Sequence, residues 1–552
     1  GIALGEASMN SLQRGLLIGA IVLLGIGEAA WITHSIRAQI SRQQEFLATR
    51  RSPSTPLPVG RTFTREEAFA FLDAVKRAEA IKDPLQRCLA YPDPPDSHWS
   101  RDAVAAYCHY RLQPVMSFAD AKTLIQQGHA AELDRRLAAA LRAQQTQPDS
   151  RGLLDRTYME DFRNGSFDIR PTLDAWKRES PKSAFAWAAS GVAYVAMAAD
   201  ARGAKYMKDT PQDNIESMNG FLAQADSDLR QAIALNPEVT PAYFGLINAG
   251  GLGLGRAYTK EAISSALAAA PDDYSIRSMA MWTLEPKWGG SLSAMDRFAA
   301  QAQTHAQTYP MMKLLLSARS YYEAENCDCD AQAQVSAYPA IFDQVSPVTD
   351  MSGAGYVASA HGHPGTAFIY LSETLRFDPF SPFAPAARAE RAFRLTDLGA
   401  PLWALAEADE VVATDPHEVG GFKARAYADE ALQDYAEAIE ALKAAIALDE
   451  SDSWPLTELG NVYVYKTREW DKAWEIATQD IQKFPQEPDG WVLRGTIQMK
   501  QPRAGLKDTY DELLARFGND PEQQATLAEM RDKLALQVGP EDHGGTKATL
   551  PR

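Results

Sequence analysis

Two pairs of metal-binding residue types stand in short, turn-like stretches of the sequence. Cys327 and Cys329 flank an aspartate, His361 and His363 flank a glycine, and the two pairs begin 34 residues apart. Two thiolates and two imidazoles form the ligand set of a structural zinc site. Zinc is not favoured, because neither pair has zinc-finger spacing and the intervening residues are typical of turns. We interpret both stretches as solvated turns, leaving a Cys327–Cys329 bond or free thiols open, and expect no cofactor.

The other two cysteines, Cys88 and Cys108, are separated by 20 residues that include the turn-rich segment YPDPPDSHW. This spacing suits a helical hairpin closed by a disulfide, which requires an oxidising compartment. The alternative is a pair of buried thiols that pack as small hydrophobic groups. Both interpretations are structural.

Sequence motifs for catalysis are absent. The chain contains no Gly-x-Ser-x-Gly, no phosphate loop ending in Gly-Lys-Ser/Thr and no His-Glu-x-x-His. The run GGLGLG at 250–255 is similar to a dinucleotide fingerprint, but a predicted helix precedes it where a strand is required. The acidic residues resemble a solvated helix surface, and no acid/base pair stands out. We therefore expect a protein that is not an enzyme and has no evident small-molecule substrate.

Composition narrows the class of partner and of fold. Lys and Arg total 55 against 72 Asp and Glu, for a formal charge of −17, which argues against a nucleic-acid binder. A chain of 552 residues predicts several domains or one extended array. After Phe63 nearly every stretch is rich in Ala and Leu at helical spacing, and strand-type alternation is almost absent. The predicted fold class is all-α.

Helix-ending signals recur along the chain at a nearly constant interval. Proline suits such stops because it cannot continue a helix and disfavours helical geometry in the residue before it. The intervals are 33, 56, 34, 39, 37, 32, 37, 34, 35 and 36 residues, so one departs strongly from the 34-residue period of a helix-turn-helix repeat. The stops are Pro148, Pro181, Pro237, Pro271, Pro310, Pro347, Pro379, Pro416, Glu450 (in a proline slot), Pro485 and Pro521.

The internal pattern of the units resembles the tetratricopeptide repeat family. The best unit has Leu459-Gly460-Asn461-Val462-Tyr463, then Ala473, then Pro485. The resemblance is close over about 380–520 and looser over 148–380. It implies a right-handed α-solenoid of helical hairpins.

A second resemblance covers about 170–310. The insertion at 201–221, Trp187, the Asn236-Pro237 stop and the segment EPKWGGS at 285–291 are similar to a proteobacterial domain of unknown function that precedes tetratricopeptide repeats. This resemblance implies no activity.

The repeat family implies a groove, lined by the first helices, that holds a peptide, a helix or a partner's tail. The family's groove positions map to Phe393, Lys423, Tyr427, Thr457 and Asn461. An acidic scaffold suits a basic or apolar segment of a protein partner. We expect a membrane-anchored interaction scaffold in a bacterial envelope or secretion-type assembly. One alternative is an immunity or inhibitor protein that sequesters a toxin or enzyme, and another is an enzyme with an unrecognised site in 61–310.

An apolar segment, GLLIGAIVLLGIGEAAWI at 15–32, carries the single charge of Glu28. It would rise roughly 27 Å as a helix, close to the thickness of a hydrocarbon core. No small-x-small cleavage site follows cleanly, so we predict a single-pass anchor in the bacterial inner membrane rather than a cleaved signal peptide. Four arginines lie between 37 and 51, which taken alone favours a cytoplasmic body. Long domains often translocate regardless of nearby charge, and we favour a periplasmic body.

These features divide the chain into successive segments. The predicted segments are leader residues 1–8, a transmembrane anchor 9–35, a Pro-rich linker 36–60, an N-terminal helical cap domain 61–147, a degenerate repeat or unknown-function domain 148–310, a repeat array 311–520, a capping helix 521–538 and a disordered tail 539–552.

Overall fold

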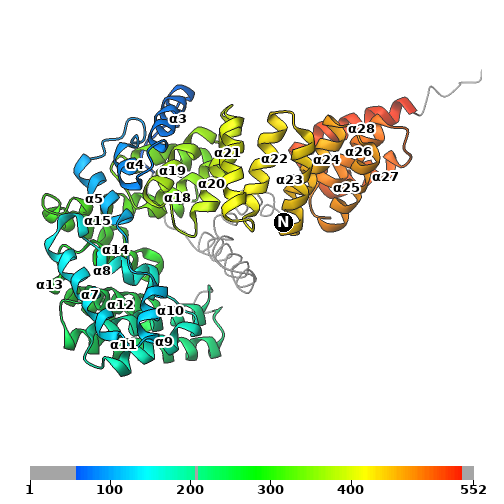
Figure 1. Ribbon diagram of the computed structural model, residues 1–552. Helices are drawn as coiled ribbons and strands as arrows, with labels where there is room; N and C mark the ends of the chain where they lie inside the picture. The colour runs from blue at the N-terminus through cyan, green and yellow to red at the C-terminus, as the bar shows by residue number, and fades with distance from the viewer. Residues whose placement is uncertain (1–56, 205–208, 538–552) are drawn as a thin grey trace, which may run out of the picture. The chain divides into compact units, whose positions relative to one another are not determined.

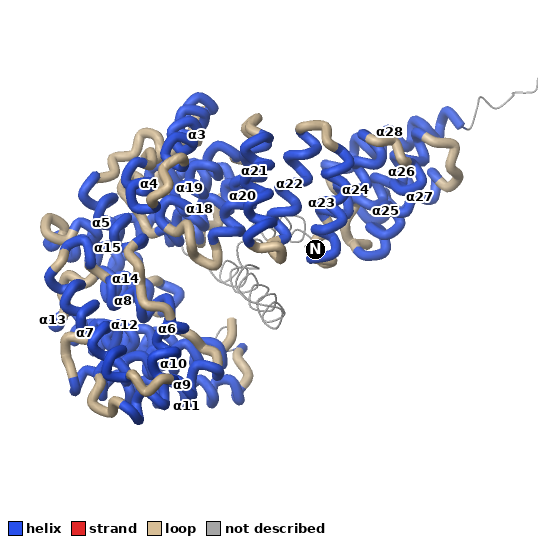
Figure 2. The backbone as a smooth tube through the Cα atoms, in the orientation of Figure 1, coloured by secondary structure: helices blue, strands red, loops and turns tan. Residues whose placement is uncertain are grey.

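The computed structural model describes residues 57–204 and 209–537. Throughout these ranges the chain forms helices, turns and loops, without a strand (Figure 2). The all-α prediction is therefore confirmed for this part of the chain. The predicted anchor, almost all of the Pro-rich linker and the predicted tail lie outside the described residues.

The chain divides into two compact units, residues 1–387 (unit 1) and 388–552 (unit 2). The division falls within α20 (Ala384–Asp397). It does not coincide with residue 311, where the sequence predicted that the repeat array begins.

Unit 1 contains helices of very different lengths (Figure 1). In chain order they are α3 (Arg65–Glu79), α4 (Pro84–Ala90), α5 (Arg101–Leu112), α6 (Phe118–Gln126), α7 (Ala130–Thr146), α8 (Leu153–Thr157), α9 (Arg170–Glu179), α10 (Ala184–Arg202), α11 (Gln212–Leu235), α12 (Thr240–Ala249), α13 (Arg256–Ala269), α14 (Tyr274–Thr283), α15 (Leu292–Ala302), α16 (Ala318–Glu325), α17 (Ala331–Ile341), α18 (Val348–Ala360) and α19 (Pro364–Phe377). Short 3-10 or π turns join them: η1 (Pro148–Ser150), η2 (Tyr158–Phe162), η3 (Phe167–Ile169), η5 (Gly250–Leu254), η6 (Pro286–Trp288), η7 (Gln303–His305) and η8 (Pro310–Ser317).

Unit 2 is a succession of helices of similar length. After α20 come α21 (Pro401–Thr414), α22 (Val419–Ala431), α23 (Tyr435–Leu448), α24 (Trp454–Asn461), η9 (Val462–Lys466), α25 (Trp470–Lys483), α26 (Asp489–Lys500), α27 (Leu506–Phe517), η10 (Pro521–Gln523) and α28 (Gln524–Gln537).

Local sequence signals explain where many helices begin and end. Thr64 and Glu67 form a reciprocal capping box at the start of α3, in which each side chain accepts the backbone N–H of the other residue. The proline stops stand just beyond helix ends. The helices α19, α21 and α25 end immediately before the stops at Pro379, Pro416 and Pro485.

The core of unit 1 is one large apolar cluster that runs from α6 to α16. Trp176, Tyr158 and Phe162 lie at its centre without solvent exposure. Helices α10 and α11 pack along their length, and their 19 and 24 residues account for the single long interval between stops. Among the described residues, α10 alone has the length and apolar composition of a membrane span. We assign it to the core, because 67% of that window is buried within the protein.

The first helices of the described ranges cover α19. Helices α3, α4 and α5 all pack against it, and α19 is buried at every position from Thr366 to Phe377. Phe71 of α3 meets Phe368 edge to face at 6.2 Å between ring centroids. The predicted cap region 61–147 is therefore divided in its packing, since α7 belongs instead to the large cluster with α8 and α10.

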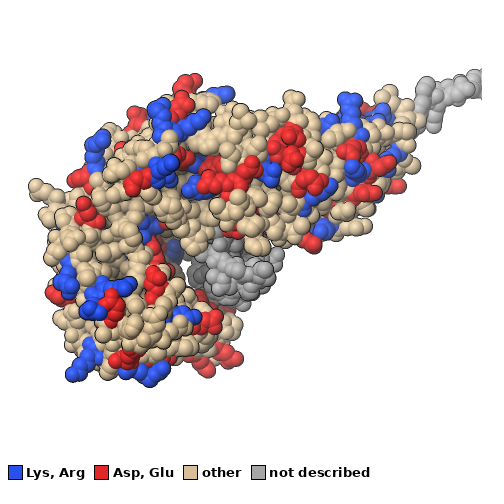
Figure 3. Space-filling model, viewed as in Figure 1, with Lys and Arg blue, Asp and Glu red and all other residues tan. Residues whose placement is uncertain are grey.

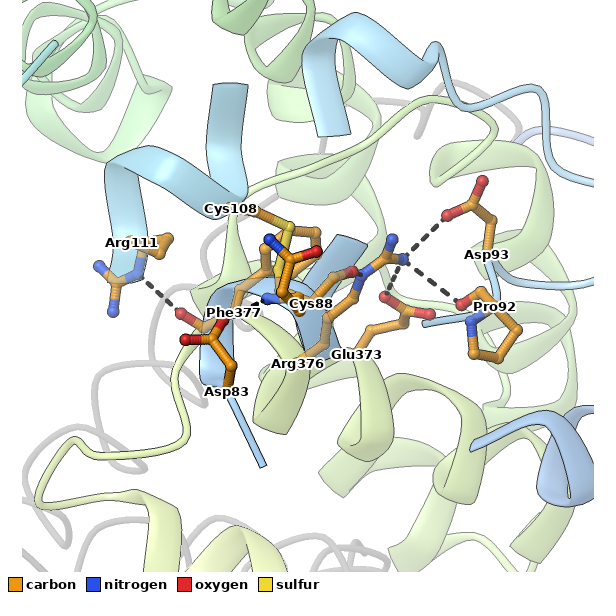
Figure 4. The surroundings of a disulfide bond; sticks show 10 residues. Asp83, Cys88, Pro92, Asp93, Cys108, Arg111, Glu373, Arg376 and Phe377 are labelled. Atoms are coloured by element: carbon orange, nitrogen blue, oxygen red, sulfur yellow. Dashed lines mark hydrogen bonds and ion pairs between the residues drawn. A yellow bond between two sulfur atoms is a disulfide. The ribbon is translucent and has the colours of Figure 1, made fainter. Parts of the chain in front are cut away.

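A buried ionic cluster and a disulfide hold this covering in place (Figure 4). Cys88 of α4 and Cys108 of α5 are disulfide-bonded, with Cα atoms 5.9 Å apart. Arg376 of α19 donates to the Cys88 carbonyl at 2.8 Å, to Asp93 at 2.9 Å and to Glu373 at 3.1 Å. Burial raises the pKa of Glu373 to about 8, although Arg376 acts in the opposite direction.

Unit 2 is built by sequential packing. Each of its helices from α21 to α28 packs on the next helix along the chain, as expected for stacked hairpins. Glycines allow the closest approaches: a Cβ at Gly460 would collide with Leu493, and one at Gly495 would collide with Met530. Gly460 belongs to the repeat unit that the sequence pattern matched best.

Candidate functional site

Half-buried aromatic rings gather on the first helices of three hairpins in unit 2. Phe393 of α20 stacks on Tyr427 of α22, with centroids 4.4 Å apart and planes inclined by 15°. Trp454, at the start of α24, meets Phe393 edge to face at 5.3 Å. All three rings keep part of their surface exposed. We call these three residues the aromatic face.

Polar side chains fix the orientation of the aromatic face. The Tyr427 hydroxyl donates to Asp397 at 2.7 Å, and burial together with this hydrogen bond raises the pKa of Tyr427 to about 12. Lys423 forms an ion pair with Asp452 at 2.6 Å and lies 5.2 Å from the centroid of Trp454. Its charge is therefore already matched within the unit.

Next to the aromatic face lies a pair of glutamates, Glu430 of α22 and Glu458 of α24, which we call the open carboxylate pair. Burial, and next the nearby Glu458, raise the pKa of Glu430 to about 8. Glu430 Oε1 accepts no hydrogen bond from the described residues. Two ionised carboxylates repel each other, and Lys466, a cation of the chain that acts on Glu430, does not offset the rise of its pKa, so a proton or a further cation stabilises the pair.

The structure brings some of the predicted groove residues together and separates others. Phe393, Lys423 and Tyr427 form one cluster through their contacts with each other and with Trp454. Thr457 instead donates to Asp480 of α25 at 2.9 Å, inside its own hairpin. Asn461 ends α24 and donates to Glu458 at 3.3 Å, which places it beside the open carboxylate pair.

Sequence reasoning missed Trp454 and the open carboxylate pair. Trp454 precedes Thr457 by three positions and Glu458 precedes Asn461 by three, so helical spacing alone places each pair on one face. The pairing of Glu430 with Glu458 had no signal in the sequence, because it depends on how α22 packs against α24.

The four weak metal candidates are not assembled into a site. Cys327 and Cys329 are joined in a disulfide, so they offer no thiolates. No group of three or more His, Cys, Asp or Glu that could hold a metal occurs in the part of the chain that the structure describes. His361 Nε2 is buried without a hydrogen-bond partner there, and His363 precedes α19. The turns that carry the two pairs were predicted, but the two cysteines and two histidines do not form a tetrahedral set of metal ligands.

The glycine run at 250–255 also has a packing explanation. It forms the π turn η5 directly after α12, so a helix precedes it, as the sequence predicted. A Cβ at Gly251 would lie 2.6 Å from the Trp282 ring, and one at Gly250 would crowd Thr259. Close packing of the turn requires these glycines, and the strand of a dinucleotide-binding motif is missing.

Charges are interspersed on the face of the molecule shown in Figure 3, where acidic and basic side chains alternate over the surface. No extended basic patch appears on that face. Because the chain carries a formal charge of −17, its average surface attracts cations rather than polyanions.

Comparisons with known proteins give little beyond the structure itself. No protein-family model matches the chain, and no curated protein matches it either. Among solved structures, the P58(IPK) TPR domain aligns with 13% sequence identity over 75% of this chain and 99% of that chain, with a TM-score of 0.21. A TM-score this low carries no argument, so the case for function rests on the contacts described above.

Proposed function

We propose that this chain is a non-catalytic protein-interaction scaffold that binds a basic and apolar segment of a partner protein on the first helices of unit 2. The observation that carries the proposal is the aromatic face next to the open carboxylate pair. Half-exposed rings such as Phe393 and Trp454 supply anchors of the kind that dominate protein interfaces. A lysine or arginine of the partner would add a second cation, besides Lys466, next to Glu430 and Glu458.

We further propose that the scaffold is attached to the bacterial inner membrane by the predicted helix 9–35 and serves an envelope or secretion-type assembly. A periplasmic body is supported by the Cys88–Cys108 disulfide, since stable disulfides belong to oxidising compartments. A reporter fused after Arg552 tests the orientation, and reporter activity on the cytoplasmic side would contradict it.

Site-specific photo-crosslinking in cells tests the binding surface. A benzophenone amino acid replaces Tyr427 in the full chain, and the control replaces Leu402 of α21, whose side chain is 72% exposed. We expect a discrete partner adduct from position 427 and none from position 402. The adduct should weaken when Phe393→Ala or Glu430→Gln is added. Equal adducts from both positions, or an adduct indifferent to both substitutions, would rule the surface out.

Affinity for the partner that crosslinking identifies separates a scaffold from an immunity or inhibitor protein. A scaffold should bind the purified partner with moderate affinity, whereas an inhibitor should bind it far more tightly. No contact in unit 2 favours the inhibitor, so the scaffold is the function we propose.

A further inference from the structure

Unit 1 contains a cavity of about 220 Å³ between its helix ends. The walls come from α5, α7 and α8 and from the turns that precede α12, α14 and η8. Four of the helix stops found in the sequence line it: Pro148, Pro237, Pro271 and Pro310. The cavity is therefore built where successive helical pairs end, far along the chain from the aromatic face.

Asp155 of α8 lies on the cavity wall and has no exposed surface. Thr240 donates its hydroxyl to Asp155 Oδ1, and Gln144 in turn donates to the Thr240 hydroxyl at 2.9 Å. The Gln144 side-chain oxygen accepts the Asp155 backbone N–H at 3.1 Å. This chain of contacts fixes the carboxyl group in place. Its second oxygen, Oδ2, accepts no hydrogen bond from the described residues.

Asp273, the N-cap of α14, stands next to Asp155 on the same wall. It accepts the Ile276 N–H at 2.9 Å, which anchors it. Burial raises the pKa of both carboxyl groups, and Asp155 is raised further by the adjacent Asp273. Two ionised carboxylates cannot hydrogen-bond to each other, but a proton on Asp155 lets it donate to Asp273. A shared proton is therefore the arrangement that satisfies both carboxyl groups without a ligand.

The cavity wall has an excess of negative charge. Besides Asp155 and Asp273 its ionisable residues are Tyr110, Arg151, Glu238, Asp272, Tyr274 and Tyr309. Arg151 is the only cation among them. It donates to the Thr308 carbonyl at 2.6 Å and lies 3.9 Å from the centroid of the Tyr309 ring. It is therefore held away from Asp155 Oδ2, and buried carboxylates without a cation are costly.

We propose that this cavity is a binding site for a small organic ammonium ion, whose nitrogen lies between Asp155 and Asp273. An ammonium group has three donors and no acceptor, so it can satisfy Asp155 Oδ2, Asp273 and one neighbouring oxygen together. The Ser275 hydroxyl, 2.9 Å from that of Tyr110, supplies such an oxygen on the wall.

The remaining walls select the size and character of the ligand. Tyr110, Pro148, Pro271 and Met311 present apolar surface to the same space. Aromatic faces favour cations as well as hydrocarbon. A volume of about 220 Å³ lies below the roughly 300 Å³ at which drug-sized ligand sites begin. The site therefore suits a short alkylammonium rather than a folded peptide.

Calorimetric titration of the full chain with butylammonium chloride tests the site, with 1-butanol as the neutral probe of matched shape. We expect butylammonium to bind at least tenfold more tightly than 1-butanol. Binding should also release the shared proton, so the measured heat should differ between phosphate and HEPES buffers. Equal affinities for the two probes, or no binding of butylammonium, would overturn the proposal without any variant.

Substitutions in the cavity test where butylammonium binds. Asp155→Asn keeps the shape and should weaken butylammonium at least tenfold while abolishing proton release. Asp161→Asn is the control, because Asp161 is a partly buried carboxyl group of unit 1 that accepts the Phe118 backbone N–H at 2.9 Å but lies outside the cavity. If Asp155→Asn does not fold, Ser275→Ala serves in its place with a smaller expected loss. Retained affinity in the folded cavity variant, or an equal loss in Asp161→Asn, contradicts the site.

The proposal is independent of the function proposed for unit 2. Glu430→Gln should leave butylammonium binding unchanged, and Asp155→Asn should leave the Tyr427 adduct unchanged. An effect of Glu430→Gln on butylammonium binding would place the ammonium on the open carboxylate pair and overturn the assignment to unit 1.

Discussion

Helix α19 in unit 1 and helix α22 in unit 2 both belong to helical hairpins, but α19 is buried whereas α22 is partly exposed. Helix α19 is buried along its length because α3, α4 and α5 cover it. Helix α22 keeps Tyr427 and Glu430 partly exposed. The carboxyl group on the covered helix, Glu373, accepts a hydrogen bond from Arg376 at 3.1 Å, whereas the cation that acts on Glu430 in unit 2, Lys466, only lowers its pKa against larger opposing effects. One oxygen of each carboxyl group accepts no hydrogen bond from the described residues.

The difference shows how one architecture can close a surface or leave it available. Where the chain supplies its own covering helices, it also supplies the arginine and the disulfide that hold them. Where no helix of the described ranges covers the surface, rings and carboxylates remain available for a group from outside. The Asp155–Asp273 pair is a third case, enclosed by walls yet lacking a cation, which is why we assign it a small ligand rather than a protein segment.

The largest effect is expected from removing Arg376, the cation that pairs with Glu373 on the covered helix α19. Arg376→Ala leaves Glu373 and Asp93 without their shared partner in a buried place, and we expect unit 1 to lose about 3–5 kcal/mol of unfolding free energy. Denaturant titration with hydrogen exchange read on α19 measures the loss. Adding Glu373→Gln should recover part of it.

The matched control is Arg230→Ala, which breaks an exposed ion pair with Asp226 on one helix of the same unit. Exposed pairs at this spacing contribute about 0.3–0.5 kcal/mol. A loss from Arg376→Ala as small as the loss from this control would mean that the ionic cluster does not hold the covering helices.

The next largest effect is expected from removing the disulfides of unit 1. Removing the Cys88–Cys108 bond by double serine substitution should destabilise unit 1 by about 3 kcal/mol, since it frees a closed loop with a sequence separation of 20. The same change at Cys327 and Cys329, separated by 2, should have a much smaller effect. Thermal unfolding of the two double variants measures both, and equal losses would contradict the reasoning from loop length.

A lysine introduced beside Glu430 should pair with this carboxyl group, as Arg376 pairs with Glu373 in unit 1. Glu458→Lys places an ammonium beside Glu430, and we expect an acetylated peptide of alternating Leu and Lys to bind about tenfold more weakly, or about 1.4 kcal/mol. Fluorescence anisotropy of the labelled peptide measures this. The control is Glu475→Lys on α25, which makes the same change of charge at an exposed site, and a comparable loss there would indicate only long-range repulsion.

The smallest expected effect is a pH dependence of unit 2. The pKa of Glu430 is about 8 in the folded chain, against about 4.3 for an unperturbed glutamate. The folded state therefore keeps this proton longer, and the stability it contributes at low pH is lost as the pH rises from about 4 to about 8. Because the side chain is partly exposed, we expect less than about 1 kcal/mol.

Glu430→Gln should flatten that decline, whereas Glu437→Gln, at an exposed position of α23, should leave it unchanged. Urea unfolding at pH 5 and pH 8 compares the three chains. An identical pH dependence in all of them would show that Glu430 is not held near its neighbour.

Several features of the fold were available from the sequence because they depend on near neighbours along the chain. The stops at Pro379, Pro416 and Pro485 follow helix ends because proline acts on its own residue and the one before it. The hairpin turns at 327–329 and 361–363 follow from turn-forming residues. Phe393, Lys423 and Tyr427 could be placed on one surface because the resemblance to the tetratricopeptide repeat family maps its groove positions onto them.

The parts of the candidate sites that the sequence did not predict depend on contacts between residues far apart in the chain. The open carboxylate pair needs the packing of α22 on α24. The shared proton of Asp155 and Asp273 needs α8 and α14 to meet 118 positions apart. The Cys327–Cys329 bond is the opposite case, because its cysteines are separated by 2 in the sequence and the sequence analysis had left this local bond open.

The sequence by itself determined the all-α class, the near-34-residue rhythm of helix ends and the acidic character of the chain, because each follows from local propensity or from counting. Only the tertiary structure decided which faces are covered and which carboxylates lack a cation. Burial and charge pairing are properties of residues brought together from far along the chain. The sequence of α19 alone therefore does not show that α3, α4 and α5 cover this helix.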